Sequence, residues 1–177
     1  DGLKENTIFN GDTMMIVTFN PNTLNATVFS VPRDTYVPIA CNGYKQNKIN
    51  SSAIGGASCV INTLNKLTGI KIDYYIKINF KGVVDLVDAV NGIEVDVPVE
   101  FCEQDSNRLF GDNEICLKKG PQTLNGEQAL ALSRHRQTLL LGDFQRVQHQ
   151  QLVVEAIATK TKTIRSVDKF YDILNAI

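Results

Sequence analysis

Residues 73–99, DYYIKINFKGVVDLVDAVNGIEVDVPV, carry the signals of a strand, a helix and a second strand in that order. β-Branched and aromatic side chains predict strands at the two ends, over 73–80 and 93–99. Asn79 is a suitable N-cap for a helix over 80–90, and the Asn-Gly pair after this helix is a typical stop. The stretch therefore predicts a β-α-β unit.

On the N-terminal side of this unit, the sequence predicts a hairpin followed by a helix. Apolar runs at 13–19 and 26–31 are separated by the turn-rich NPNTLN, a pattern typical of antiparallel strands. Serines and Gly69 bracket a helix predicted over 51–69. The pair Gly55-Gly56 weakens that helix, which suggests that another part of the chain packs close to it.

On the C-terminal side, a loop and two helices are predicted. The polar residues 100–120 indicate a loop bracketed by cysteines. Asn125 and Gln128 have the spacing of a capping box at the start of a helix. Residues 144–165 have the periodicity of a long amphipathic helix, with Asp143 at its start.

Together these elements predict a mixed α/β (α+β) fold, with a central mixed β-sheet flanked by helices, in a single domain over 1–177. A hydrophobic content of 43% is sufficient for one sizeable core. Eighteen basic and nineteen acidic residues nearly balance, so a general nucleic-acid-binding surface is not expected. No run reaches the ~18 apolar residues of a membrane span, and no signal-peptide pattern is present. The abrupt start at Asp1 and the helix-like run to Ile177 suggest an excised ectodomain whose anchor lies outside this sequence.

The four cysteines contain no C-x-x-C pair, so neither a zinc site nor a redox dithiol is indicated. Their even number and loop-like surroundings favour two disulfides, and the sequential pairing closes two short loops: Cys41 with Cys59, and Cys102 with Cys116. Such a pairing predicts an oxidising compartment. Four buried free thiols are the alternative.

The stretch SRHRQTLLLGDFQRVQHQQ is rich in groups that bind anions. If its start is extended, Arg134 and Arg136 point to one side. Arg146 and Gln150 share one face of the following helix, with His149 beside them. A guanidinium binds phosphate oxygens bidentately and keeps its charge, and the start of a helix also attracts anions. The stretch therefore predicts an anion site, although each residue taken singly is more often solvated or paired with a surface carboxylate.

A second polar group is expected at the end of the predicted hairpin. Asp12 precedes its first strand, and Arg33 and Asp34 follow its second, so the three lie at neighbouring strand ends. Aspartates beside an arginine match the needs of a magnesium-pyrophosphate site, because carboxylates bind the metal and guanidinium binds the phosphates. A simple ion pair of Arg33 with either aspartate is the alternative.

Six stretches resemble the LytR-CpsA-Psr family in order and spacing, over about residues 12–158: GDTMMIVTFNP, SVPRDTYV, KINSSAIGGA, DYYIKINFKGVVDLVDAVNGIEVDVP, LNGEQALALSRHR and GDFQRVQHQQ. One of these alone is a weak signal, whereas six in order are specific. The resemblance implies a membrane-anchored extracellular enzyme of Gram-positive bacteria. Such an enzyme moves a glycopolymer, a teichoic acid or a capsular polysaccharide, from an undecaprenyl-pyrophosphate carrier to peptidoglycan.

The resemblance also assigns roles to individual residues. The residues that match the family's pyrophosphate-binding positions are Arg33, Arg134, Arg136, Arg146 and Gln150. Two further side chains, Lys48 and His149, are expected to contact the substrate. Asp12 matches the metal-binding aspartate, and Asp1 is the one candidate for a second. His149 stands where the family pattern R-x-x-R-Q has an arginine, so charge at this position depends on pH or is lost.

In the implied reaction, the arginines and Mg²⁺, with Mn²⁺ as the alternative metal, neutralise the two phosphates. An acceptor hydroxyl of peptidoglycan attacks the phosphorus nearer the glycan and releases polyprenyl phosphate, and Asp34 or Asp143 orients or deprotonates that hydroxyl. The lipid would need an apolar channel, which a gap between the sheet and helices over 80–90 and 144–158 would supply. A filled core is the alternative, since periodicity does not distinguish the two. Two rival functions are a polyprenyl-pyrophosphate phosphatase, with water as acceptor, and a non-catalytic module that binds wall polymers.

Overall fold

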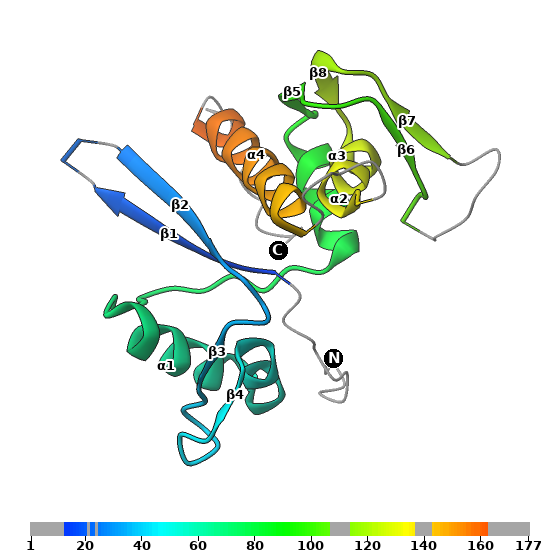
Figure 1. The fold of residues 1–177 in the computed structure, drawn as a ribbon. Coiled ribbons are helices and arrows are strands. Elements are labelled where there is room, and N and C mark those ends of the chain that lie inside the picture. Colours follow the sequence, from blue (N-terminus) through cyan, green and yellow to red (C-terminus); the bar gives the residue numbers. More distant parts are fainter. Residues whose placement is uncertain (1–12, 21, 24, 107–113, 137–142, 163–177) are drawn as a thin grey trace, which may run out of the picture. The chain divides into compact units, whose positions relative to one another are not determined.

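The computed structural model describes most of the chain, over residues 13–20, 22–23, 25–106, 114–136 and 143–162 (Figure 1). The chain divides into two compact units, Asp1–Tyr75 and Ile76–Ile177, each with a buried apolar cluster of its own. Strands and helices occur in both units, so the mixed α/β class is confirmed. The single domain over 1–177 and the apolar channel stay predictions.

The first unit begins with the expected hairpin. Strands β1 (Met14–Asn20) and β2 (Asn25–Val31) are antiparallel, with Met14 opposite Val31. Met14 and Ile16 alternate toward the buried cluster, as a strand period of two requires. The predicted hairpin is therefore confirmed.

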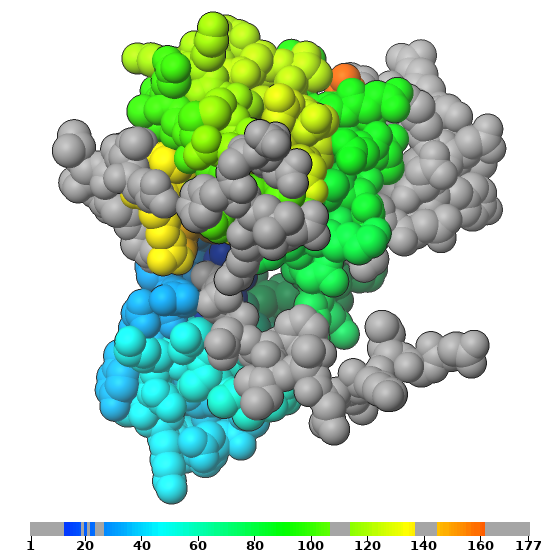
Figure 2. Space-filling view, turned by 90° about the vertical axis from the view of Figure 1, so that its right-hand side faces the viewer, coloured from blue at the N-terminus to red at the C-terminus, as the bar shows by residue number. Residues whose placement is uncertain are grey.

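A short second ladder and two helical segments complete the first unit. Strand β3 (Tyr36–Pro38) pairs with β4 (Gln46–Lys48), and the exposed residues 41–48 are seen in cyan at the surface in Figure 2. The 3₁₀ helix η1 (Ile49–Gly55) then leads into α1 (Gly56–Thr68).

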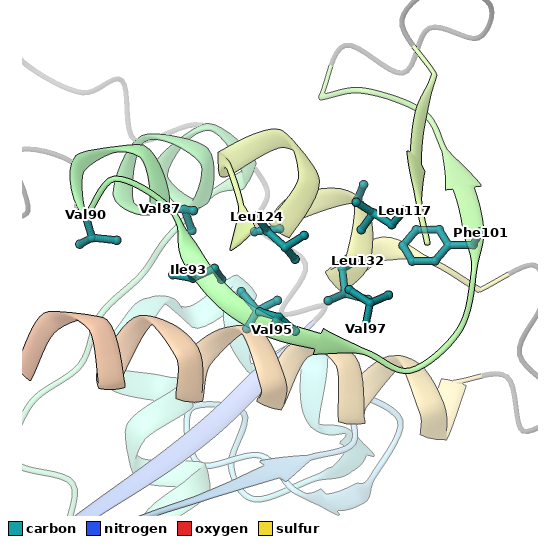
Figure 3. Packing of buried hydrophobic residues seen from close by; sticks show 12 residues of the cluster. Val87, Val90, Ile93, Val95, Val97, Phe101, Leu117, Leu124 and Leu132 are labelled. Carbon is teal, nitrogen blue, oxygen red and sulfur yellow. The ribbon is translucent and has the colours of Figure 1, made fainter. Parts of the chain in front are cut away.

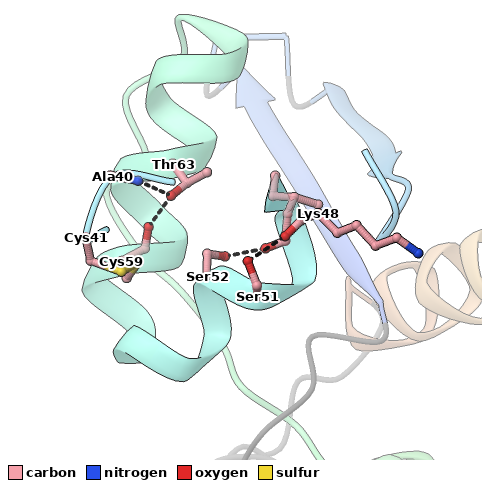
Figure 4. Close-up of a disulfide and its surroundings, with 8 residues drawn as sticks. Ala40, Cys41, Lys48, Ser51, Ser52, Cys59 and Thr63 are labelled. Carbon is pink, nitrogen blue, oxygen red and sulfur yellow. Dashed lines mark hydrogen bonds between the residues drawn. A yellow bond between two sulfur atoms is a disulfide. The ribbon is translucent and has the colours of Figure 1, made fainter. Parts of the chain in front are cut away.

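The residues that bracket α1 differ in part from the prediction. Gly69 ends the helix in the left-handed conformation, with φ of 71°, as expected. The serines do not cap α1: the hydroxyls of Ser51 and Ser52 donate to the carbonyls of Lys48 and Ile49 inside η1 (Figure 4). Short-range bonding within the 3₁₀ helix satisfies these hydroxyls first, so they are not available to α1.

The position of Gly55 explains why the predicted helix contains a glycine pair. A Cβ at this position would lie 2.9 Å from Cys59 Sγ, so the backbone of Gly55 packs directly against the Cys41–Cys59 disulfide. The expected close approach is thus confirmed. Thr63, one turn further along α1, donates to Cys59 O and accepts from Ala40 N–H, which ties the helix to the segment that carries Cys41 (Figure 4).

The predicted strand over 73–80 is not formed. Residues 71–79 have no regular secondary structure and pair with none of the described strands. Tyr74 and Ile76 are 92% and 69% exposed. The β propensity of these side chains is not enough to form a strand without a neighbour that supplies the ladder hydrogen bonds.

The described residues of the second unit form three helices and two ladders. Its helices are α2 (Phe80–Ala89), α3 (Gly126–Arg134) and α4 (Asp143–Lys162). Strand β5 (Ile93–Val97) pairs antiparallel with β8 (Gly120–Leu124), and β6 (Phe101–Glu103) pairs with β7 (Ile115–Leu117). The described strands of the whole chain thus form four two-stranded sheets, and a wider central sheet is not formed among them.

Two predictions about this unit are corrected. The β-α-β unit is replaced by α2 followed by β5, whose partner is the distant β8. The supposed loop over 100–120 contains the β6–β7 hairpin, in which Cys102 lies opposite Cys116 and is bonded to it. Polar composition misled the second prediction, because each strand of this hairpin has only three residues, too few to show an apolar alternation.

The core of the second unit is built from alternating residues of β5 and from the inner faces of the helices. Ile93, Val95 and Val97 are buried, and Leu124 and Leu132 lie beside them (Figure 3). Asn79 caps α2 by accepting from Gly82 N–H, as predicted. The capping box of α3 is also confirmed, since Asn125 and Gln128 each accept from the other's backbone N–H. None of the described helices has the length and apolar character required to cross a membrane.

Candidate anion-binding site

The first group of predicted site residues lies in the first unit, just after β2. Thr35 N–H and its hydroxyl both donate to Pro32 O, at 3.0 and 2.6 Å, and close a tight turn that presents Arg33 and Asp34. Lys48, at the end of β4, reaches the same place. Its Nζ lies 2.7 Å from Asp34 Oδ1, and Arg33 Nε lies 3.7 Å from Asp34 Oδ2.

Asp34 therefore contacts two cations, the adjacent Arg33 and Lys48 from the end of β4. The hydrogen bond from Lys48 is the largest of the causes that hold the pKa of Asp34 below its usual value. Desolvation comes next and opposes it, and the charges of Lys48 and Arg33 then add to the lowering. A carboxylate with a lowered pKa is a weak general base near neutral pH. The arrangement suits Asp34 to positioning Lys48 and Arg33. The role of Arg33 in pyrophosphate binding stays a prediction.

The second group lies where α3 ends. Arg134 is the last residue of α3, so it is helical and not extended as predicted; His135 follows it with extended backbone angles. Arg134 Nη1 donates to Asp105 O at 3.0 Å, and its Cζ lies 5.3 Å from the centre of the Phe80 ring. A carbonyl and an aromatic ring thus hold this guanidinium without neutralising its charge. Arg136, two residues further, is exposed.

Helix α4 packs against α3 through a polar face. Arg146 and His149 are only 5% and 3% exposed, and Val153 continues the same buried face at helical spacing. Gln150 Nε2 donates to Ser133 O at 3.2 Å, which joins the two helices. Arg146 and Gln150 are therefore held near the end of α3, as the shared helix face predicted, but Arg146 is buried.

His135 is a functional candidate that the sequence interpretation did not assign. It is 1% exposed, its ring stacks on Phe101 at 4.0 Å, and Nδ1 lies 3.7 Å from Glu103 Oε2. Burial lowers the pKa of His135, and the Glu103 carboxylate opposes this. The sequence did offer evidence for a role of His135. It is one of only two histidines in the chain, and it lies between the motif arginines Arg134 and Arg136.

His149 is also held mainly neutral. Burial, and next the charge on His135, lower the pKa of His149, while a hydrogen bond to the backbone of Leu132 opposes them. The two histidines thus influence each other's titration across the α3–α4 contact. Near neutral pH, the fixed positive charge of this region resides on the arginines.

The predicted metal ligands are not placed by the structure. Asp1 and Asp12 lie outside the described residues, and so does the side chain of Asp143, whose backbone begins α4. In the part of the chain that the structure describes, one group has metal-ligand spacing, namely Cys102, Glu114 and Cys116. Both sulfurs of that group are bonded to each other in a disulfide, so it does not fit a metal ion.

Both predicted disulfides are confirmed, Cys41–Cys59 and Cys102–Cys116, and no cysteine is free. The alternative of four free thiols is therefore excluded. The first bridge fastens α1 in the first unit (Figure 4), and the second joins β6 to β7 in the second.

The predicted site residues thus form two groups, one in each unit. Arg33, Asp34 and Lys48 belong to the first, whereas the second contains the residues of α3 and α4: Arg134, Arg136, Arg146, His149 and Gln150. The binding of one ligand by all four arginines stays a prediction.

Solved structures and sequence relatives resemble the chain over most of its length. The B. subtilis TagV crystal structure matches with a TM-score of 0.79 and 32% identity, over 93% of this chain and 62% of that one. A structure described as TagT bound to LIIa-WTA matches with a TM-score of 0.72 and 26% identity, over 93% and 68%. The polyisoprenyl-teichoic acid–peptidoglycan teichoic acid transferase TagU of Enterococcus faecalis is 38% identical over 167 residues, which are 94% of this chain and 52% of that protein.

The chain spans about half the length of the sequence relatives it matches, at 52% of each of the first two. The LytR_cpsA_psr family model, in contrast, matches all of residues 1–177. The chain belongs to the LytR_cpsA_psr family, the family that its six motifs resemble.

Proposed function

We propose that the protein is a phosphotransferase that attaches an anionic glycopolymer of the teichoic acid type to peptidoglycan, using a polyprenyl-pyrophosphate-linked donor. The observation that carries the proposal is the junction of α3 and α4, where backbone carbonyls hold Arg134 and Gln150, and where Arg146 is buried on the same helix as Gln150. Relatives of the chain are named teichoic acid transferases, which supports this class of reaction. Capsular polysaccharide is the alternative cargo.

In this reaction the acceptor hydroxyl attacks the phosphorus nearer the glycan. The bond from that phosphorus to the bridging oxygen breaks, and polyprenyl phosphate leaves with both electrons of the bond. The arginines stabilise the negative charge that builds on the leaving phosphate. Arg134 is suited to this role because its guanidinium is oriented by Asp105 O and the Phe80 ring.

The lowered pKa of Asp34 helps to decide which aspartate acts as the base and which positions the cations. Because Lys48 and Arg33 keep this carboxylate ionised, we assign Asp34 to positioning those two cations rather than to proton abstraction. Asp143 remains the proposed base. Mg²⁺, or Mn²⁺, is the proposed metal, with Asp12 and Asp1 as ligands, and it would supply further neutralisation of phosphate charge.

The proposed location is the outer face of the membrane of a Gram-positive bacterium, with an anchor outside this sequence. Two formed disulfides support an oxidising compartment. The proposed partners are the undecaprenyl-pyrophosphate-linked glycopolymer and the peptidoglycan acceptor, without nucleic acid.

The test is a transfer assay with the intact protein, a synthetic polyprenyl-pyrophosphate-linked glycan and a soluble peptidoglycan oligosaccharide. Mass spectrometry should detect a phosphodiester-linked product. Arg134→Lys keeps the charge but loses the planar fork, so turnover should fall roughly 100-fold, as is typical when one transition-state donor is lost. Arg108→Lys, at an arginine outside every motif, is the matched control and should retain activity.

Each other outcome identifies a rival function. Release of free glycan phosphate without a linked product would show a phosphatase. Donor binding that persists in EDTA, with no turnover in any condition, would show a binding module. Equal loss of turnover in Arg134→Lys and Arg108→Lys would contradict the assignment of the site.

A further inference from the structure

A single peptide group after β6 joins the two ends of α3. The carbonyl of this peptide, Asp105 O, accepts a hydrogen bond from Arg134 Nη1 at 3.0 Å. The N–H of the same peptide, Ser106 N–H, donates to Glu127 Oε2 at 2.8 Å. Because a peptide group is planar and its C=O and N–H point in opposite directions, a guanidinium and a carboxylate hold its two sides. Glu127 lies in the first turn of α3, and Arg134 is the last residue of that helix.

The positions of the two side chains on α3 make this arrangement possible. Glu127 and Arg134 are seven residues apart, which is about 10.5 Å along the helix axis and only about 20° around it, so both lie on the same face. Ion pairs within a helix usually join residues three or four apart, whereas here a peptide from another element links the two charges. Strand β6 brings that peptide to α3, and Phe101 of β6 belongs to the same buried cluster as Leu132 of α3 (Figure 3).

Glu127 also has a simpler explanation as a helix-stabilising residue. An acid in the first turn of a helix interacts favourably with the helix dipole. This effect accounts for the charge of Glu127, but it does not require the bond to Ser106 N–H, which lies outside α3. The carbonyl of the same peptide faces Arg134, to which the proposed reaction assigns a role. Glu127 therefore has a physical connection to the candidate site.

We infer that Glu127 is a positioning residue, which fixes the peptide of Asp105 and Ser106 so that its carbonyl orients the guanidinium of Arg134. The inference rests on the proposed function, because Glu127 acts there only through a phosphate-binding arginine. Without the carboxylate, the peptide loses the bond that sets its orientation, and Arg134 loses a fixed acceptor. Linked hydrogen bonds also polarise one another, so a charged acceptor at the N–H makes the carbonyl a stronger acceptor.

The first test measures the binding of inorganic pyrophosphate to the intact protein by isothermal titration calorimetry. Glu127→Ala should raise Kd roughly 10-fold, the lower end of the effect of a hydrogen bond to a charged group. The sign is informative, because removal of a negative charge by itself would strengthen the binding of an anion. Glu127→Gln keeps an acceptor for Ser106 N–H and should recover most of the loss. Glu155→Ala, at an exposed position of α4, is the matched control and should bind as the native protein does.

A double-mutant cycle then shows whether Glu127 acts through Arg134. Arg134→Lys keeps the positive charge, so binding stays measurable, but it has no planar fork to orient. In this background, Glu127→Ala should weaken pyrophosphate binding much less than it does in the native protein. Equal weakening in both backgrounds would overturn the inference, and so would tighter binding in Glu127→Ala. Circular dichroism melting verifies that the variants fold. Glu127→Gln also loses the charge at the helix start, so it separates the dipole effect from the positioning role.

The transfer assay separates failure of this inference from failure of the proposed function. Glu127→Ala should lower kcat/KM for the donor roughly 10-fold and leave KM for the acceptor unchanged, since one charged hydrogen bond is lost on the donor side. Native transfer and native pyrophosphate binding in Glu127→Ala would overturn the positioning role and leave the proposed function intact. Absence of transfer in every protein, with the cycle as expected, would support the role of Glu127 and contradict the proposed function. Absence of pyrophosphate binding in the native protein would overturn both.

Discussion

His135 and His149 are the two buried histidines of the candidate site. Both lie in the second unit, at 1% and 3% exposure, and burial is the main reason that the pKa of each lies below the ordinary value of 6.5. The family pattern R-x-x-R-Q led us to expect an arginine at the position of His149. Here the buried imidazole stays neutral near pH 7, so this position adds no fixed charge to the site.

We expect the second unit to lose stability in mild acid. Because the folded pKa values are lowered, the unfolded chain takes up protons below about pH 6.5 that the folded chain does not. The contribution is complete above pH 6.5 and is lost as the pH falls through the lowered folded values. Urea unfolding at pH 7.5 and pH 5.0 should show this decrease, and His149→Gln, which cannot titrate, should make it smaller. An unchanged difference in His149→Gln would show that this imidazole does not contribute.

At the scale of elements, the contact between α2 and α3 depends on a residue without a side chain. Gly126 begins α3, its N–H donates to Asp88 Oδ1 at 2.8 Å, and a Cβ there would lie 2.7 Å from Val84 Cα. The two helices could not remain at this distance if the residue had a side chain. The glycine of the motif LNGEQALALSRHR is thus explained by packing.

Gly126→Ala should therefore destabilise the protein by roughly 1–3 kcal/mol, the usual cost of overpacking. Helix propensity alone predicts the opposite, a gain of up to about 1 kcal/mol for replacing glycine by alanine. Urea unfolding of Gly126→Ala distinguishes these two expectations. If the free energy of unfolding of the variant equals or exceeds that of the native protein, the α2–α3 contact relaxes easily.

At the scale of the whole molecule, each unit contains one disulfide and one buried cluster. The bridges close loops with sequence separations of 18 and 14 residues. Loops of this length are expected to contribute about 3 kcal/mol each by restricting the unfolded chain. Each unit is therefore expected to depend on its disulfide for part of its stability.

Loss of one bridge should lower the melting temperature by roughly 6–12 °C, since 1 kcal/mol corresponds to about 2–4 °C in a chain of this size. Differential scanning calorimetry of the double variant Cys102→Ala, Cys116→Ala measures the contribution of the second bridge. Dithiothreitol should lower the melting temperature of this variant further by acting on Cys41–Cys59. If reduction left the native melting temperature unchanged, neither bridge would stabilise the fold.

The sequence by itself determined the features that depend on neighbours along the chain. The β1–β2 hairpin, the Asn79 cap, the capping box of Asn125 and Gln128, and the Gly69 stop are all as predicted. Each rests on contacts between residues only a few positions apart, or on the turn between two adjacent strands. The cysteine pairing was also correct, because both bridges close short loops.

Only the tertiary structure decided which distant segments meet. Ile93 pairs with Leu124 in an antiparallel ladder where the sequence pattern suggested β-α-β, and Asp34 binds Lys48 from the end of another strand. The sequence assigned Arg146 to an anion site on the same helix face as Gln150, but it did not reveal that Arg146 is buried or that Gln150 bonds to α3. The physical reason is that helical spacing defines the faces of a helix but not which of them is buried, since burial depends on the element that packs against it.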